Sequence, residues 1–418
     1  MLYNMLFSSP LIRGTLDPDI KWSFEPDSKT LRKDTIGTTP YLKSQDNSHC
    51  RVAGTKEPQF NSTNNWKNYA TIARIGESRN IALRRLLATE RRLARDTSLA
   101  KQYSSFMEEY LLLGHMEKVT NEDSTSRCYL PHHPVVKEAS TTTKVRMVFD
   151  ASCKTSTGIS LNDCLLCGPT TQEDLRSIIL RCRTKQIMMV ADVEKMFRQI
   201  LLRQEDRPLQ CILWRSSSTE DVSAYELCTV TYGTKSAPFL ATRTLNQLAL
   251  DEEHRFPLAA KAIHEDTYVD DVLTGANNIE EARDLRHQLE KLTESGGMRL
   301  RKWASNCSEV LEGVSEDNLA IQTDSISLDL DPLVKTLGLS WMPNSDVFRF
   351  EFNFPVIEAI AELTKRQILS AIAMLFDPLG LIGAVITTAK VIMQRLWTLL
   401  DGDGCPSRLG PTGAVNGG

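Results

Sequence analysis

The 418-residue sequence predicts an α+β fold in which an antiparallel sheet is backed by helices. Apolar residues recur at helical spacing over long stretches of the chain. Several short β-prone runs also lie close enough in sequence to pair as hairpins. With 41% hydrophobic and 24% charged residues, the chain has the composition of a globular protein with a sizeable core.

The first two segments of the chain differ in pattern. Residues 1–65 carry Pro, Ser, Asn and Thr without sustained periodicity, which predicts a poorly ordered segment. Residues 66–118 are predicted to be a helical region, because leucines and aromatic residues recur at helical spacing from Arg79 to Gly114. Asp96 interrupts this pattern and is expected to cap a second helix, with Gly114 at its end.

The middle of the chain alternates short strands with helices. "RCYLPHHPVV" and "TTKVRMVFDAS" are β-prone, a helix is expected at Glu173–Arg183, and Ile187–Val193 is predicted to be a buried strand. "LQCILWR" and "AYELCTVTYG" resemble an antiparallel pair, and "SAPFLATRTLNQLAL" a helix with Pro238 in its first turn. "YVDD" is expected at the tip of a hairpin, before a helix at Ile279–Glu294.

The C-terminal part is expected to be mostly helical. "KTLGLSWM" and "VFRFEF" predict one more hairpin, and a helical region covers Lys365–Leu400 with a break at "FDPLG". The Gly-rich tail, residues 401–418, is expected to be disordered. The longest apolar run, Leu379–Met393, contains Lys390 and is too short to cross a bilayer, so no membrane partner is expected.

Three aspartates are the candidates for chemistry. Asp270 and Asp271 are adjacent in the expected hairpin, and Asp192 closes an apolar strand. Adjacent aspartates in a turn, taken alone, are more often simply solvated. If the strand and the hairpin are neighbours, however, three carboxylates converge, and such a site requires bound cations. Mg²⁺ suits it, and two such ions can stabilise both the attacking and the leaving oxygen in phosphoryl transfer.

Ordered motifs give the chain a family resemblance. "VADVEKMFRQI", "TYGTKSAPFLA" and "YVDD" resemble motifs A, B and C of reverse transcriptases, and "KVRMVFDAS" resembles their fingers strand. With "SLNDCLLCGPT", "LRKWASN" and "FDPLGL", the chain is similar to Bel/Pao-type LTR retrotransposon polyproteins over about residues 75–397. The resemblance implies a right-hand polymerase, with fingers and palm over 119–305 and a thumb- or connection-like Pao-type region over 306–400.

The resemblance also implies roles for the site residues. Asp192, Asp270 and Asp271 would be catalytic and would bind two Mg²⁺ ions, for which Mn²⁺ can substitute. The carbonyl of Val193 would be a further ligand. The activity implied is RNA-directed DNA polymerisation, in which a primer 3′-OH attacks a dNTP and pyrophosphate leaves.

Five residues would contact the incoming nucleotide. Arg146 matches the fingers arginine that binds the triphosphate, with Lys144 or Lys137 assisting it. Phe197 would exclude a ribose 2′-OH, although core packing alone also explains an aromatic residue there. The remaining two are Tyr232 and Gly233 of motif B.

Four further residues complete the implied site. Tyr268 and Val269 would lie at the primer terminus, and Pro238 would lie under the template and primer. Lys302 fits a general acid that protonates pyrophosphate, and a solvated surface lysine fits nearly as well. The partners implied are an RNA or DNA template with primer, and dNTPs. A net charge of −4 allows this, because the basic residues cluster locally.

The setting implied is that of a polyprotein fragment. Protease, RNase H and integrase segments are expected as partners rather than within this chain. Ten scattered cysteines predict reduced thiols, and no signal-peptide pattern precedes them, so a cytoplasmic virus-like particle or the nucleus is expected rather than secretion. The alternative to an enzyme is an inactive, truncated retroelement relic that at most binds nucleic acid.

Overall fold

The computed structural model describes most of the chain between residues 50 and 399. The described ranges are 50–52, 67, 69–120, 127–136, 145–320, 333–349 and 364–399. The chain divides into two compact units, of which the larger comprises Ser44–Leu337 and Trp341–Val347. The predictions of a poorly ordered start and a disordered tail fall almost entirely outside the described residues.

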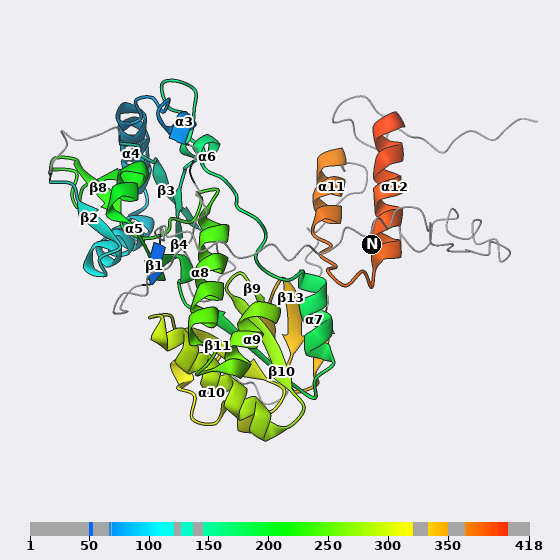
Figure 1. Ribbon diagram of the computed structural model, residues 1–418. Helices are drawn as coiled ribbons and strands as arrows, with labels where there is room; N and C mark the ends of the chain where they lie inside the picture. Colours follow the sequence, from blue (N-terminus) through cyan, green and yellow to red (C-terminus); the bar gives the residue numbers. More distant parts are fainter. Residues whose placement is uncertain are drawn as a thin grey trace, which may run out of the picture. The chain divides into compact units, whose positions relative to one another are not determined.

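The larger unit contains a four-stranded antiparallel sheet with strand order β11-β5-β10-β9. Its strands are β5 (Ile187–Val193), β9 (Thr267–Tyr268), β10 (Asp271–Ala276) and β11 (Leu300–Ser305). Every residue of β5 except Asp192 is buried, as expected of an apolar central strand. Helices contact β10 and back the sheet (Figure 1): α7 (Leu175–Arg183), α9 (Pro257–Glu265) and α10 (Ile279–Ser295).

Two smaller sheets and two helices form the other part of this unit. The sheets are β2-β8-β7, with β2 (Met116–Lys118), β7 (Cys211–Trp214) and β8 (Ser223–Leu227), and β3-β4, with β3 (His132–Val136) and β4 (Val145–Phe149). The helices are α4 (Arg79–Leu93) and α5 (Thr97–Leu112). The intervening elements are β1 (Cys50–Val52), α3 (Tyr69–Ile72), α6 (Leu161–Cys164), η1 (Met196–Gln199), β6 (Ile200–Leu202), η2 (Gln204–Gln210), α8 (Ala237–Glu252), η3 (Ser308–Leu311) and η4 (Glu316–Asn318).

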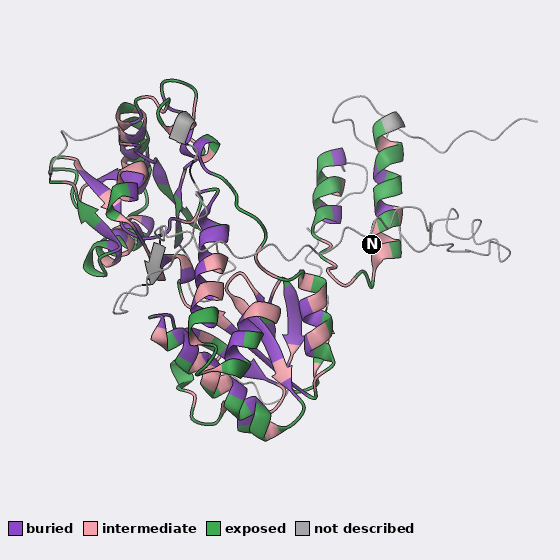
Figure 2. Cartoon of the chain, in the orientation of Figure 1, coloured by how far each residue is buried: buried purple, intermediate pink, exposed green. Residues whose placement is uncertain are grey.

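Most of the predicted elements are present. Asp96 caps α5 by accepting from the N–H of Leu99, and Gly114 follows this helix with φ +69°. One difference lies within 66–118, which is not purely helical. After Gly114 the chain enters β2, which pairs with β8, because Met116 is buried at the start of this strand. Figure 2 shows the buried residues concentrated in the sheets and on the inner sides of the helices.

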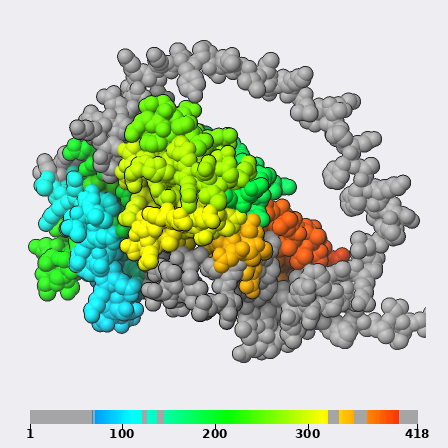
Figure 3. All heavy atoms as spheres, turned by 90° about the horizontal axis from the view of Figure 1, so that it is seen from below, coloured from blue at the N-terminus to red at the C-terminus, as the bar shows by residue number. Residues whose placement is uncertain are grey.

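One face of the larger unit combines distant segments of the chain. Seen from below, residues around 100, around 280 and around 300 are exposed together (Figure 3). Farther along the chain, β12 (Val334–Thr336), β13 (Leu339–Met342) and β14 (Val347–Arg349) form a three-stranded sheet. In the smaller unit, α11 (Lys365–Ala373) and α12 (Gly383–Leu399) pack through Ile372, Ala389 and Met393, with the predicted break between them. None of the helices described here has the length and apolar character needed to cross a membrane.

Candidate active site

Asp192 lies at the end of β5, beside the hairpin that carries Asp270 and Asp271. Strands β5 and β10 are antiparallel, and their register places Asp271 directly opposite Asp192. The backbone N–H of Val193 donates to the carbonyl oxygen of Asp270 at 2.8 Å. Directly opposed residues of antiparallel strands present their side chains on the same face of the sheet. The structure therefore places the three aspartates at the same end of the sheet.

The turn of this hairpin is conformationally unusual. Tyr268 pairs with Asp271, so Val269 and Asp270 alone connect the two strands. Val269 has φ +57°, which is rare and strained for a β-branched residue. Its N–H donates to Oε1 of Gln172 at 2.9 Å, which fixes the turn from outside the sheet. Strain that the surroundings maintain in this way is typical of functional sites.

Lys302 reaches the same site from β11. The pairing of β11 with β5 is irregular between Arg301 and Ala304, and Lys302 has φ +54°. Such bulges redirect side chains. The Nζ of Lys302 here lies 2.9 Å from Oδ2 of Asp192. Because this side chain is half exposed, the ion pair adds little to the free energy of folding. Its importance is that it places the Lys302 ammonium group next to Asp192.

The carboxylates carry uncompensated negative charge. Burial, followed by the charge of Asp192, raises the pKa of Asp270 above its usual range. Burial and the charges of Asp270 and Asp192 raise the pKa of Asp271 to about 7. Lys302 acts against both rises without cancelling them. An additional cation would therefore be bound favourably at this position.

The donor set fits a divalent metal ion by its chemistry. Carboxylate and carbonyl oxygens are the ligands that Mg²⁺ prefers. Within the ranges that the structure describes, no group of three or more His, Cys, Asp or Glu side chains is already gathered around one point in a metal-binding arrangement. Lys302 instead supplies the positive charge next to Asp192. Two ions would thus require Asp192, Asp270 and Asp271 to draw closer together.

The charge of Arg146 acts on both Asp270 and Tyr232. Burial raises the pKa of Asp270 and of Tyr232, and in both cases the positive charge of Arg146 acts against that rise. Arg146 is exposed on β4. The ring of Tyr232 packs against Phe149, with the ring centres 5.5 Å apart. Phe197, in η1, is half buried at the edge of the main core, which leaves part of its ring accessible.

Gly233 and Pro238 belong to the turn that leads into α8. Gly233 has φ +97°, and a Cβ at this position would meet the carbonyl oxygen of Phe149 at 2.6 Å. Only glycine suits this conformation and this close approach. Pro238 is exposed in the first turn of α8, as predicted. The turn therefore presents backbone rather than side chain towards β4.

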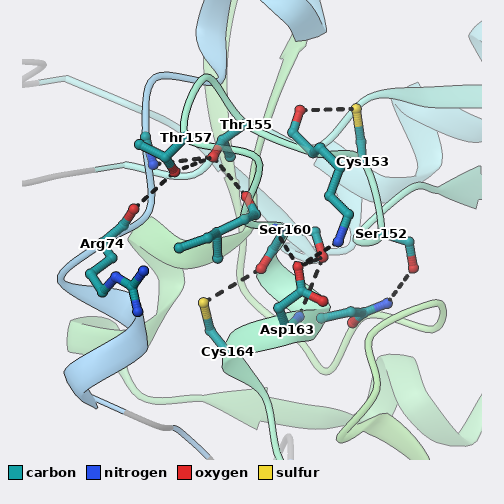
Figure 4. Close-up of polar contacts among 12 residues, drawn as sticks. Arg74, Ser152, Cys153, Thr155, Thr157, Ser160, Asp163 and Cys164 are labelled. Carbon is teal, nitrogen blue, oxygen red and sulfur yellow. Dashed lines mark hydrogen bonds and ion pairs between the residues drawn. The ribbon is translucent and has the colours of Figure 1, made fainter.

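Asn162 holds this turn, and sequence reasoning did not single it out. Its Nδ2 donates to the carbonyl oxygen of Gly233 at 3.1 Å and to Oγ of Ser152 at 2.8 Å, and its Oδ1 accepts from the N–H of Lys235 at 2.8 Å. Figure 4 shows the polar contacts that order the surrounding loop. Ser160 and Asp163 form a capping box there. The capping pattern is visible in the sequence "SLND", and it was the one signal that could have drawn attention to this loop and to Asn162 within it.

Two predicted residues are not described. Lys144 and its alternative, Lys137, lie outside the described residues, so their assistance to Arg146 stays a prediction. Of the remaining predicted residues, the three aspartates, Val193, Tyr268, Val269 and Lys302 meet at one end of the β11-β5-β10-β9 sheet.

Comparisons with known proteins agree with this geometry. Residues 136–304 match the family of reverse transcriptases (RNA-dependent DNA polymerases). Residues 364–401 match the Pao retrotransposon-like RNaseH-like domain. The Pao-type region expected over 306–400 thus contains a match to an RNaseH-like domain, although RNase H was expected outside this chain. No curated protein matches the chain.

A solved structure similar to this chain is the foamy viral protease-reverse transcriptase dRH in complex with ds DNA. The identity is 16% and the TM-score 0.47, and the similarity covers 71% of this chain and 43% of that one. This chain therefore spans less than half of the length of that relative. The two family matches, in this order along one chain, support a Pao-type retrotransposon reverse transcriptase region.

Proposed function

We propose that this chain is an RNA-directed DNA polymerase that extends a primer 3′-OH with dNTPs. The observation that carries the proposal is the register that sets Asp271 opposite Asp192, beside Asp270. The match of residues 136–304 to reverse transcriptases supports it independently. The competing possibility, an inactive relic that at most binds nucleic acid, predicts the same fold without catalysis.

The residues of the site have distinct roles in this proposal. Asp192, Asp270, Asp271 and the carbonyl of Val193 would hold two Mg²⁺ ions or, in their place, Mn²⁺. Such ions stabilise charge on the attacking and leaving oxygens. The exposed guanidinium of Arg146 binds the triphosphate. Lys302 holds a proton next to Asp192, where it can pass to the leaving pyrophosphate.

The hairpin and the turn before α8 position the remaining partners. Tyr268 and Val269 flank the aspartates and so contact the primer terminus. The turn at Gly233 and Pro238 brings backbone close to the base pair that forms. Exposed arginines along α4 offer sequence-independent contacts to template and primer phosphates. These are Arg84, Arg85, Arg91 and Arg92 of α4, together with Arg95 just beyond its end.

The polyprotein context extends the proposal. Protease, RNase H and integrase segments are the expected partners, and the RNaseH-like match at 364–401 supports this setting. A cytoplasmic particle or the nucleus is the proposed location. The eight cysteines whose side chains the structure describes are free thiols, which fits a reducing compartment.

Phe197 provides a test of substrate choice. Its ring is half buried, and the accessible part would clash with a ribose 2′-OH. We expect Phe197→Ala to raise the use of rNTP relative to dNTP by at least about tenfold. Values of kcat/KM for UTP and dTTP on poly(rA) measure this ratio. An unchanged ratio would show that the ring serves core packing alone.

Primer extension tests the proposed function itself. The wild-type chain should extend oligo(dT) on poly(rA) with Mg²⁺ or Mn²⁺, and Asp270→Asn and Asp271→Asn should abolish the product. Glu194→Gln is the matched control, because Glu194 follows the same strand and pairs with Arg301 instead. Extension at full strength in the aspartate variants would refute the site. Absence of product from the wild type would favour the inactive relic.

A further inference from the structure

The turn that carries Asp270 is held by a glutamine from a different segment of the chain. Gln172 lies 97 positions before Val269, in the bend that precedes α7, and is half buried. Its Oε1 accepts a hydrogen bond from the N–H of Val269 at 2.9 Å. Val269 has φ +57°, a conformation that a β-branched residue adopts only at a steric cost. The hydrogen bond therefore stabilises a turn conformation that valine itself disfavours.

Helix α8 fixes the backbone beside Gln172. The Nδ2 of Asn246 donates to the carbonyl oxygen of Thr171 at 2.6 Å, and the hydroxyl oxygens of Thr171 and Thr242 lie 2.7 Å apart. Thr242 and Asn246 are one turn apart on α8, so they share one face of this helix. Contacts from α8 thus anchor Thr171, the residue directly before Gln172.

Helix α7 follows Gln172 and contacts both strands of the hairpin (Figure 1). The side chain of Asp174 caps the start of this helix. Near its end, Nη1 of Arg181 lies 2.8 Å from Oδ1 of Asp266, which directly precedes β9. The Oδ2 of Asp266 accepts from the hydroxyl of Thr274, on β10, at 2.7 Å. One segment of the chain therefore holds both the base and the turn of this hairpin.

We propose that Gln172 is a positioning residue that prepares the two hairpin aspartates for cation binding by holding the turn at Val269. Asp270 directly follows Val269, and Asp271 begins β10. A cation requires its oxygen ligands at defined distances, and a change in the backbone of Val269 would move both carboxylates. Holding the turn before the cation arrives removes an ordering cost from binding. The inference rests on the cation site of the proposed function and adds to it a residue that acts through the turn.

Gln288 provides a matched control. It is half buried, as Gln172 is, and its Oε1 accepts from the N–H of Leu258 at 3.0 Å. This hydrogen bond joins α10 to α9 and does not involve the turn at Val269. Gln172→Met and Gln288→Met each keep a long side chain and remove one acceptor for a backbone N–H. A purely structural role predicts similar consequences for both variants, whereas a positioning role predicts that only Gln172→Met weakens cation binding.

The test measures the binding of Mn²⁺ to the full chain by electron paramagnetic resonance. We expect Gln172→Met to weaken this binding about three- to tenfold, which corresponds to the loss of one hydrogen bond. Gln288→Met should bind Mn²⁺ as the wild type does. Hydrogen exchange at the amides of residues 268–271 should be faster in Gln172→Met and unchanged in Gln288→Met, because only the first loosens the turn. Melting temperatures confirm that all variants fold.

Val269→Gly tests whether Gln172 acts through the turn. Glycine adopts φ +57° without the steric cost that valine bears, so the turn should no longer depend on Gln172. In the Val269→Gly background, Gln172→Met should therefore change Mn²⁺ binding by less than about twofold. If the effects of the two substitutions simply add, Gln172 does not act by holding the strained turn, and the positioning role is overturned.

The outcomes separate this inference from the proposed function. If the wild type binds Mn²⁺ and Gln172→Met binds it equally well, the positioning role is wrong and the cation site stands. The same holds if Gln288→Met weakens binding as much as Gln172→Met does. If the wild type binds Mn²⁺ without extending a primer, the polymerase function fails, and the two glutamine variants still decide the positioning role. If the wild type binds no Mn²⁺, the cation site fails and the positioning role fails with it.

Discussion

Folding opposes the ionisation of the Asp271 carboxyl group. Burial and the charges of Asp270 and Asp192 raise the pKa of Asp271 to about 7, whereas the pKa of an aspartate in an unfolded chain is about 3.9. Between these values the folded chain binds a proton that the unfolded chain has released. The contribution of Asp271 is therefore most favourable below about pH 4 and is lost as the pH rises through about 7. Burial, together with repulsion from Asp270 and Asp192, thus explains why the site favours a cation.

Replacing Asp271 tests this directly. Without divalent ions, we expect Asp271→Asn to have a free energy of unfolding about 1–2 kcal/mol above that of the wild type at pH 8. This range allows for solvent screening of a partly exposed group. At pH 4 the wild-type carboxyl is protonated, so the two should agree. Urea unfolding at both pH values measures the difference. A variant less stable than the wild type at pH 8 would be inconsistent with the raised pKa.

Gly233 shows how strongly one backbone position can depend on its residue. Gly233→Ala combines an unfavourable φ of +97° with a Cβ 2.6 Å from the carbonyl oxygen of Phe149, so we expect a loss of about 2–4 kcal/mol. Gly114→Ala is the control, because φ is +69° there and nothing lies within 4 Å of the added Cβ. It should cost about 1 kcal/mol. Chemical denaturation compares them, and equal losses would remove the steric argument.

Local signals explain why the elements themselves were predictable. The apolar run Ile187–Val193 is β5, Asp96 caps α5, and Pro238 begins α8 within its first turn. Contacts between elements leave no such signal in a single sequence. The hydrogen bond from Asn162 reaches a residue 71 positions later, and Lys302 approaches Asp192 only because β11 is irregular. Half-buried Phe197 remained ambiguous, because core packing and substrate contact favour the same residue type.

The connection between the loop before α6 and the turn before α8 is testable through Asn162. Asn162→Ala removes hydrogen bonds to Gly233, Lys235 and Ser152, so we expect a loss of about 1–2 kcal/mol, because these contacts are exposed. Ser152→Ala removes one of them and should cost about 0.5 kcal/mol. Unfolding in urea measures both values. Equal losses would show that Asn162 does not hold the turn.

The candidate active site lies where segments of the larger unit that are distant in sequence meet. β5, the β9-β10 hairpin and β11 bring the aspartates and Lys302 together, and α5 supports the segment after Asp192. The reverse transcriptase match begins at residue 136, yet helices α4 and α5 belong to the same compact unit. The resemblance in sequence therefore located the motifs, while the structure shows which earlier elements support them.

The most direct test of whether Asp192, Asp270 and Asp271 act as one cation site is the binding of Mn²⁺. Electron paramagnetic resonance measures this binding as a loss of the signal of the free ion. We predict that the wild-type chain and Glu194→Gln bind Mn²⁺ alike. Asp192→Asn and Asp270→Asn should each lose most of this binding, because each removes a ligand. Undiminished binding by the variant that carries both aspartate substitutions would contradict the site.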